Sequence, residues 1–440
     1  MQRLRPTALA RLLATLALIS AAFATHAQPV EPVGVAVEAN GREPWVVTYR
    51  LGEPARQLSF ARSPDTSRTR DWAVGEGFEI VATDDGEVLR RQDGAAFSQA
   101  TVVMPPRYRE LPMDYAPFSP FGDGGMLAYT GRLFVCPEAC SGDERWAFTL
   151  EAAPDLNVLV NGEITQGRAA WTESGQGTNI YVGAGRPVAS EAVVAVIDEA
   201  LPPVIRDQLM AELPRFMDQF AGHLGVLDAP PMLFASWDTS VVDGSYGRQG
   251  GTLPGQVFIH FYGSFWNEEM ARGGFADGLS WHFAHEAAHL YQRQIYTSAR
   301  EGSWIHEGGA EAMAALALME GRPDQAAGVE AVIAAKRAEC AERLAGRSIR
   351  HALSEGDTEV PYACGMVVNL ALHEALLREA PGSDGLYAVW RDYISRAQGA
   401  ETVTEALFLE AVANVGGGPL ADDVAAAIAD PRFDPAAVAF

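Results

Sequence analysis

Residues 279–296 read LSWHFAHEAAHLYQRQIY, a stretch without proline or glycine that predicts an α-helix. It contains the pattern His-Glu-x-x-His. Because residues four apart in a helix lie on the same face, His285 and His289 can present two ring nitrogens to one cation, and Glu286 beside them can reach a water on that cation. Zinc suits such ligands, and catalysis requires a third protein ligand and an open position. Two surface histidines on an ordinary helix are the alternative.

A second acidic motif follows in residues 304–311, which read WIHEGGAE. We expect Glu307 to open the next helix. A hairpin of the two helices would return it to His285 and His289 as the third ligand of a metal site. Glu311, four residues further on, lies on the same face. It is either the hydrogen-bond partner of a ligand histidine's outer nitrogen or a solvated helix carboxylate.

The N-terminus has the three-part pattern of a secretory signal peptide. Three arginines lie within the first eleven residues, residues 12–25 carry no charge, and small residues follow up to Ala27. A membrane anchor is the alternative, but the apolar run is shorter than the ~20 residues that a spanning helix needs. We therefore predict that residues 1–27 are removed near Ala27 and that the protein is periplasmic or secreted.

Composition excludes several function classes. The 440 residues are 48% hydrophobic and 20% charged, which is typical of a globular protein, and the formal net charge is −24. Because so acidic a chain offers no continuous cationic surface, we expect neither nucleic-acid binding nor docking on an anionic membrane. No stretch after the N-terminal segment is predicted to be long and apolar enough to span a bilayer, so we expect no stable membrane insertion. The sequence leaves the oligomeric state open.

Four cysteines remain after cleavage: Cys136, Cys140, Cys340 and Cys364. An even number in an oxidising compartment permits disulfides, and four cysteines allow three pairings. We expect the pairs Cys136–Cys140 and Cys340–Cys364, each within one half of the chain. A metal site at Cys136 and Cys140 is disfavoured, because no second pair lies nearby to complete four ligands.

The chain divides into two parts with different sequence patterns. Residues 28–188 read as β-structure, with strand-like alternation over 45–50 and hairpin dipeptides at Asp85-Gly86 and Asn161-Gly162. Residues 104–123, rich in proline and aromatic side chains, are expected to form a long loop. No catalytic motif occurs in this part.

From residue 189 on, short apolar runs alternate with helical spacing. We predict strands and helices at 193–197, 201–224, 232–235, 257–261, 275–296, 305–320 and 326–344. The predicted fold class is therefore α+β, with a β-rich N-terminal domain, 28–188, before a domain with a small sheet and a helical body, 189–440. The strand at 257–261 is expected to pair with an extended peptide by edge addition.

The motifs HEAAH at 285–289 and WIHEGGA at 304–310 resemble those of the gluzincin zinc metallopeptidases. They are most similar to the group of aminopeptidase N, leukotriene A4 hydrolase and the glycyl aminopeptidases. Residues 361–365, PYACG, are similar to that group's Pro-Tyr-Glu-Lys-Gly segment. The resemblance implies a thermolysin-like catalytic domain behind an N-terminal β-domain. It also implies one zinc ion per chain, with Glu307 favoured over His306 as the third ligand.

The resemblance further implies a reaction, the hydrolysis of peptide bonds by zinc-activated water. Glu286 would act as the general base, and Tyr362 would stabilise the transition state. The expected partner is a peptide or protein substrate. The alternative is a catalytically silent zinc-binding protein that serves as a peptide-binding module, and the presence of Glu286 and Tyr362 favours the enzyme. A serine hydrolase of the Gly-x-Ser-x-Gly type and a P-loop nucleotide enzyme are disfavoured, because neither motif occurs.

Three departures separate this chain from that group. The gap between His289 and Glu307 is shorter by one residue than in aminopeptidase N, and Cys364 stands at the position of the lysine. The segment Gly-x-Met-Glu-Asn, which holds the free amino terminus of the substrate in that group, is missing. The corresponding region, 250–261, supplies no glutamate, so the sequence leaves exopeptidase and endopeptidase action open.

Overall fold

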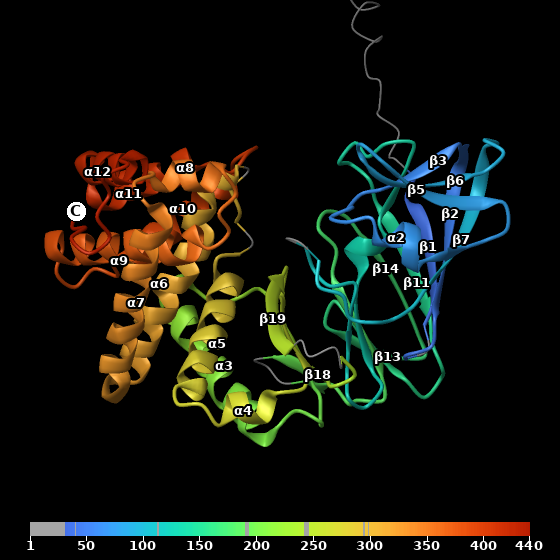
Figure 1. Ribbon diagram of the computed structural model, residues 1–440, viewed down its shortest axis with the longest axis horizontal. Coiled ribbons are helices and arrows are strands. Elements are labelled where there is room, and N and C mark those ends of the chain that lie inside the picture. The colour runs from blue at the N-terminus through green and yellow to red at the C-terminus, as the bar shows by residue number, and fades with distance from the viewer. Residues whose placement is uncertain are drawn as a thin grey trace, which may run out of the picture.

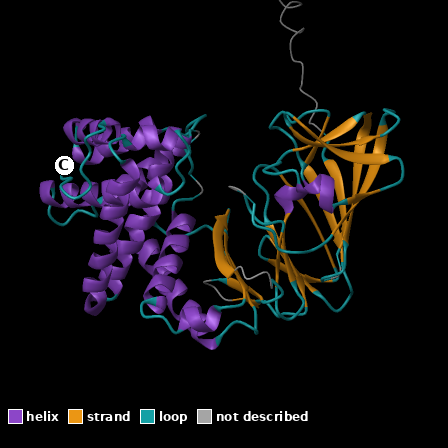
Figure 2. Ribbon diagram, in the orientation of Figure 1, coloured by secondary structure: helices purple, strands orange, loops and turns teal. Residues whose placement is uncertain are grey.

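The computed structural model describes residues 31–39, 41–111, 114–189, 193–241, 246–293, 295–297 and 299–440. Two bodies lie side by side, one made mostly of strands and the other mostly of helices (Figures 1 and 2). We call the elements from β1 to β15 the β region and those from β16 to α12 the helical region. The predicted signal segment, 1–27, lies outside the described residues, so its cleavage stays a prediction.

The described part of the β region contains three sheets and one short helix, α2 (Ser67–Asp71). The largest sheet has the order β14 (Arg168–Glu173), β11 (Trp146–Glu151), β1 (Val33–Glu38), β2 (Trp45–Ala55), β7 (Phe97–Met104), β4 (Ala73–Val74). A second has the order β10 (Val135–Pro137), β3 (Gln57–Phe60), β6 (Gly86–Arg91), β5 (Phe78–Thr83). The third has the order β13 (Glu163–Gln166), β12 (Asn157–Val160), β15 (Asn179–Gly183), β9 (Met126–Tyr129), β8 (Phe118–Pro120).

The local patterns that predicted β-structure are confirmed. The three alternate residues Trp45, Val47 and Tyr49 of β2 are buried, and their neighbours are partly or fully exposed. Asn161 and Gly162 both have positive φ, 50° and 79°, as the tight turn between β12 and β13 requires. The hairpin of β5 and β6 also forms, but its turn lies one residue earlier than predicted, at 84–85, because Thr83 pairs with Gly86.

The helical region begins with a five-stranded sheet in the order β16 (Val188–Ala189), β17 (Val194–Ile197), β18 (Met232–Asp238), β20 (Gln256–Gly263), β19 (Tyr246–Leu253). The long helices are α3 (Pro203–Leu224), α5 (Phe275–Tyr291), α6 (Ser303–Gly321), α7 (Ala326–Leu344), α9 (Val360–Glu379). Shorter helices are α4 (Trp266–Met270), α8 (Ile349–Ser354), α10 (Leu386–Ala397), α11 (Glu405–Gly416), α12 (Gly418–Ala429). The α+β fold class is therefore confirmed.

Three details differ from the sequence prediction. The strand at 257–261 is not an edge, because β20 is hydrogen-bonded on both sides; the edge is β19, whose Gly250 and Gly251 weaken the strand pattern. The helix predicted to reach residue 296 ends at 291, because Arg293 adopts a left-handed φ of 55°. The expected loop at 104–123 contains strand β8.

Each region has its own hydrophobic core, and a third cluster joins them. That cluster packs Phe121 and Tyr181 of the β region with Val196 and Phe234 of the helical region. Strand β16 pairs with β17 across the predicted boundary at 188–189, so this division into two domains stays a prediction.

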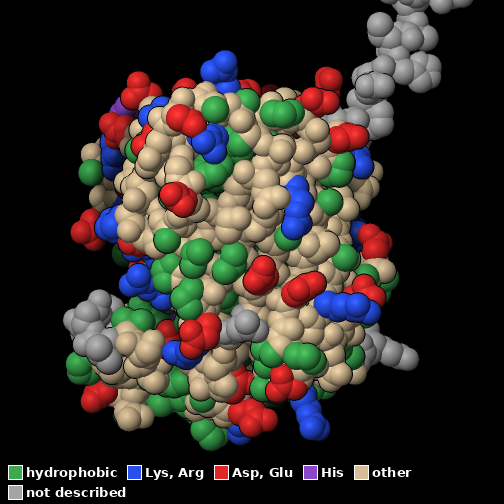
Figure 3. All heavy atoms as spheres, turned by 90° about the vertical axis from the view of Figure 1, so that its right-hand side faces the viewer, with side chains coloured by type: hydrophobic (Ala, Val, Ile, Leu, Met, Phe, Trp, Pro, Cys, Tyr) green, Lys and Arg blue, Asp and Glu red, His purple; other side chains and the backbone are tan. Residues whose placement is uncertain are grey.

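Both expected disulfides form, Cys136–Cys140 in the β region and Cys340–Cys364 between α7 and α9. Helix α9 has the length and hydropathy of a membrane span, so the expectation that no later stretch has this character is wrong. Within the fold, however, 78% of the apolar 18-residue stretch of α9 is buried, and the helix packs against α6 and α7. The outer face of the β region carries basic side chains scattered among acidic ones (Figure 3).

Candidate active site

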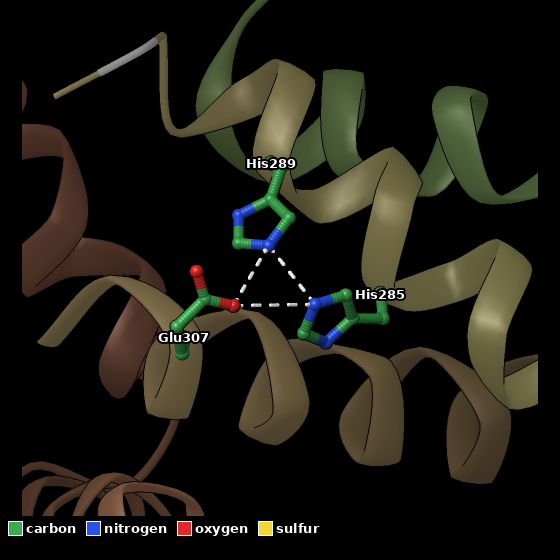
Figure 4. A group of neighbouring side chains, drawn as sticks. All are labelled: His285, His289 and Glu307. Atoms are coloured by element: carbon green, nitrogen blue, oxygen red, sulfur yellow. Dashed lines mark hydrogen bonds and ion pairs between the residues drawn. The ribbon is translucent and has the colours of Figure 1, made fainter. Parts of the chain in front are cut away.

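Three side chains from α5 and α6 converge on one point (Figure 4). The Nε2 atoms of His285 and His289 lie 2.9 Å apart, and the Oε2 atom of Glu307 lies 3.5 Å and 3.2 Å from them. Among the described residues, no other group of three or more His, Cys, Asp or Glu side chains converges in this way. Two imidazole nitrogens and a carboxylate oxygen are the ligand set of a catalytic zinc site.

The outer nitrogens of both histidines face polar partners. His285 Nδ1 lies 3.3 Å from Glu311 Oε1, and the other oxygen of this carboxylate accepts a 2.7 Å hydrogen bond from Trp281 Nε1. Glu311 is only 8% exposed, so it is not a solvated helix carboxylate. On the other ligand, His289 Nδ1 lies 2.7 Å from Gln292 Oε1.

Gln292 fixes the tautomer of His289. Its Nε2 donates a 2.9 Å hydrogen bond to the backbone carbonyl of His306, which leaves its Oε1 to accept from His289 Nδ1–H. The Nε2 lone pair of His289 is then free to bind a cation. This arrangement fits the zinc ion that the sequence implies. Sequence analysis missed Gln292, although its position three residues after His289 on one helix face was a usable signal.

A close contact between α6 and α9 positions the rest of the site. A Cβ atom on Gly308 would lie 2.3 Å from the backbone of Gly365, and one on Gly365 would lie 2.7 Å from the Trp304 carbonyl oxygen. Glycine at both positions therefore lets the helices touch. Asn369 Nδ2 spans the contact, with hydrogen bonds to the carbonyls of Trp304 and Gly365. The contact places the first turn of α9 beside Glu307.

Tyr362 lies in that first turn and lines the same cleft as the three converging side chains. Its ring centroid is 5.8 Å from that of His285. Burial, together with the carboxylates of Glu307 and Glu286, raises the pKa of the Tyr362 hydroxyl above its ordinary value. The hydroxyl therefore stays protonated at neutral pH and can donate a hydrogen bond.

Glu286 lines the same cleft and lies beside strand β19. A Cβ atom on Gly250 would lie 2.7 Å from Glu286 Oε1, so only glycine fits there without displacing this carboxylate. Burial raises the pKa of the Glu286 carboxyl above its ordinary value, in part opposed by the two ligand histidines. A buried carboxylate with a raised pKa has the properties that a general base requires.

Charges within the cluster compensate one another. Burial lowers the pKa of His285, but the nearby carboxylates of Glu307 and Glu311 outweigh burial and raise it well above the ordinary value. Burial raises the pKa of Glu307, but His289 and His285 outweigh burial and bring it well below the ordinary value. These opposite shifts are typical of buried groups that need a countercharge.

The remaining histidines near the motif do not join the cluster. His306 is buried, and its ring stacks on that of His289 with centroids 4.3 Å apart, while Glu307 occupies the converging position. The Nδ1 atom of His282 lies 3.7 Å from the Oε1 atom of Glu286. His260 is buried on β20, where its Nδ1 lies 2.7 Å from the Ser236 hydroxyl.

The cleft has a volume of about 1170 Å³ and is lined by both regions. From the β region, Arg62, Asp114 and Tyr115 line the same cleft as the three converging side chains. No motif marks these residues, and they reach the cleft only through the packing of the two regions, so they could not be predicted from sequence patterns.

Comparison with known proteins places the fold. No protein-family model matches the sequence, and no curated protein matches it. Among solved structures, an M1 zinc metallopeptidase from Deinococcus radiodurans matches with a TM-score of 0.53 and 13% identity over 91% of this chain and 93% of that one. A mutant of the M1 zinc metallopeptidase from the same organism, bound to a Tyr-Ser-Ala substrate, gives a TM-score of 0.53 and 14% identity, covering 91% of this chain and 94% of that one.

Yeast leukotriene A4 hydrolase matches with a TM-score of 0.54 and 12% identity over 89% of this chain, which spans 66% of that protein. At such identities, the likeness establishes the fold. The chain therefore has the two-part architecture of the M1 zinc metallopeptidases, a β-rich part before a helical body.

Proposed function

We propose that the chain is an exported zinc-dependent peptidase that hydrolyses peptide bonds. The observation that carries this proposal is the convergence of His285, His289 and Glu307 beside Glu286 and Tyr362 in one cleft. The fold shared with M1 zinc metallopeptidases supports it, as does the peptide substrate bound to the Deinococcus enzyme. One zinc ion per chain, bound by the three converging side chains, would lower the pKa of a bound water to about 7 and polarise the substrate carbonyl.

Two protein side chains supply proton transfer and stabilisation of the developing negative charge. The Glu286 carboxylate accepts the proton of the attacking water and delivers it to the nitrogen of the leaving amine. The Tyr362 hydroxyl donates a hydrogen bond to the oxygen on which negative charge develops. The backbone of β19, beside Glu286, offers hydrogen-bonding groups to an extended substrate.

A digestion experiment tests the proposal. The exported chain, 28–440, loaded with zinc, is incubated with a mixed peptide library, and the products are read by mass spectrometry. We expect cleavage that a chelator abolishes and added zinc restores. If the zinc-loaded protein cleaves no peptide, the peptidase proposal fails and the chain is better described as a peptide-binding module.

Export is a separate proposal. It rests on the signal-like pattern of residues 1–27, and the two disulfides are compatible with an oxidising compartment. Intact-mass measurement of the full chain secreted from a bacterial host should give a protein that begins at Gln28. A protein that retains Met1 in the membrane fraction would contradict this proposal.

A further inference from the structure

The register of the β19–β20 hairpin shows which backbone groups of β19 face away from β20. β19 is an edge of its sheet and pairs with β20 across the two-residue turn Pro254-Gly255. Leu253 and Gln256 close this turn as a hydrogen-bonded pair. Because hydrogen bonding alternates along an antiparallel strand, the N–H and C=O groups of Arg248, Gly250 and Thr252 point away from β20. These groups are the ones that an added strand would bind.

Gly250 marks the reacting centre on this edge. Its Cα lies close enough to Glu286 that an added Cβ would be 2.7 Å from the carboxylate oxygen. A substrate strand paired with Gly250 would therefore lie beside the general base. Thr252 is the next outward-facing residue toward the turn, and Arg248 is the next in the other direction.

The carbonyl of Thr252 is already occupied by a residue of the β region. Tyr115, in the loop between β7 and β8, donates a 2.7 Å hydrogen bond from its hydroxyl to the Thr252 carbonyl oxygen. An added Cβ on Gly251 would lie 3.1 Å from the Tyr115 ring, so the ring covers the strand at this point. Thr252 is itself buried, and Tyr296 lies close to its side chain.

Tyr115 is held rigidly in this position. Its ring makes edge contacts with Tyr129 and Phe258, at centroid distances of 5.0 Å and 5.5 Å. The preceding Asp114 accepts hydrogen bonds from both Nε and Nη2 of Arg62, at 3.1 Å and 2.8 Å, and from the backbone N–H of Tyr115. Because two rings pack against Tyr115 and its neighbour Asp114 is anchored by Arg62, Tyr115 acts as a wall and not as a mobile lid.

We infer that Tyr115 determines specificity by ending the strand-pairing surface at Thr252. At about 3.3 Å per residue, the distance from Gly250 to Thr252 accommodates one or two substrate residues. Beyond these one or two residues, the substrate contacts the Tyr115 side chain, because the Thr252 carbonyl already accepts a hydrogen bond from the Tyr115 hydroxyl. The favoured substrates are therefore peptides with a chain end at this side of the cleft, cut one or two residues from that end. This inference rests on the proposed peptidase function.

Product lengths test the inference. The zinc-loaded protein is incubated with a library of decapeptides that have free termini, and early products are sized by mass spectrometry. We expect fragments that lack one or two residues from one terminus. Tyr115→Ala should raise the ratio of internal to terminal cuts at least tenfold. Tyr115→Phe, which keeps the ring but loses the hydroxyl, should raise it by less.

Tyr108→Ala is the matched control. Tyr108 belongs to the same loop and stacks on His260 and Tyr262, so its removal should leave the product pattern unchanged. Zinc content and melting temperature show that each variant is folded, and Tyr115→Phe alone decides if Tyr115→Ala does not fold. Internal cuts by the wild type, or an unchanged pattern in a folded Tyr115 variant, would overturn the inference but leave the peptidase intact. No cleavage by the zinc-loaded wild type would overturn both.

Discussion

The two walls of the cleft differ in how far apart their residues lie in the sequence. The wall with the proposed metal ligands, here called the metal-ligand wall, comes from α5 and α6, and its three converging side chains lie within residues 285–307. The opposite wall joins Tyr115 of the β region to Thr252, 137 residues away. A short motif with helical spacing makes the first wall predictable. The second wall depends on how two regions pack, which no local pattern encodes.

Removal of one proposed ligand should abolish both zinc binding and cleavage. His289→Ala leaves two of the three converging groups, and we expect loss of zinc and of detectable cleavage. The fall in zinc affinity should exceed the ~10–100-fold that loss of an outer hydrogen-bond partner costs. Competition with a chromophoric chelator measures it. Zinc affinity equal to that of the wild type would show that His289 is not a ligand.

Tyr362→Phe removes one hydroxyl at the place where α9 meets the metal-ligand wall, and so tests whether this third helix contributes to the reaction. We expect kcat to fall by ~10²–10³ if the hydroxyl stabilises the developing oxyanion, as for other oxyanion donors. KM and zinc content should change little, because the ring remains in place beside His285. Steady-state kinetics on one peptide from the library measure both constants. An unchanged kcat would remove Tyr362 from the reaction.

Gln292→Leu tests the partner of His289 that sequence analysis missed. Without the amide, His289 Nδ1 loses its acceptor, and we expect zinc affinity to fall by ~10–100-fold. The absorption spectrum of the cobalt-substituted protein should shift, because the geometry of the ligand changes. Gln208→Leu is the control, since Gln208 bonds Ser280 at the other end of α5. Equal zinc affinity in both variants would contradict a positioning role for Gln292.

The smallest expected effect lies in the β region and concerns stability alone. Burial raises the pKa of Glu173 from 4.5 to about 7, so the folded protein binds more protons than the unfolded chain between these values. Stability therefore falls as pH rises through this range, by up to ~3 kcal/mol from this group.

Glu173→Gln should remove that dependence. Relative to the wild type, its melting temperature should be higher at pH 8 and nearly equal at pH 4.5, by roughly 2–4 °C per kcal/mol. Thermal unfolding followed by circular dichroism at several pH values measures the difference. A difference that does not change with pH would contradict the raised pKa, and peptidase activity should stay the same in both proteins.

Much of the fold followed from local patterns. Helix α7 has the predicted bounds, and Asn161-Gly162 forms the predicted turn, because each depends on neighbouring residues. The edge strand β19 was missed, since two adjacent glycines gave no strand signal. Those glycines lie where β19 closely approaches Glu286 on one side and Tyr115 on the other, so tertiary packing overrode the local pattern.

The candidate site likewise has one part that local patterns predicted and another that they did not. His285, His289 and Glu307 converge as the motif spacing predicts, and Glu311 lies beside the outer nitrogen of His285. The lining residues of the β region were beyond prediction, because their positions depend on contacts between distant segments. Their roles in binding, like those of the motif residues in catalysis, stay predictions.

Zinc content and peptide turnover, measured on the same samples of wild type and Glu286→Gln, test the central claim most directly. In the proposed mechanism, His285, His289 and Glu307 bind the metal, and Glu286 transfers the proton. We predict one zinc ion per chain in both proteins and a turnover at least ~10²-fold lower in Glu286→Gln, as loss of a general base entails. Wild-type turnover in a zinc-loaded Glu286→Gln protein would contradict the account.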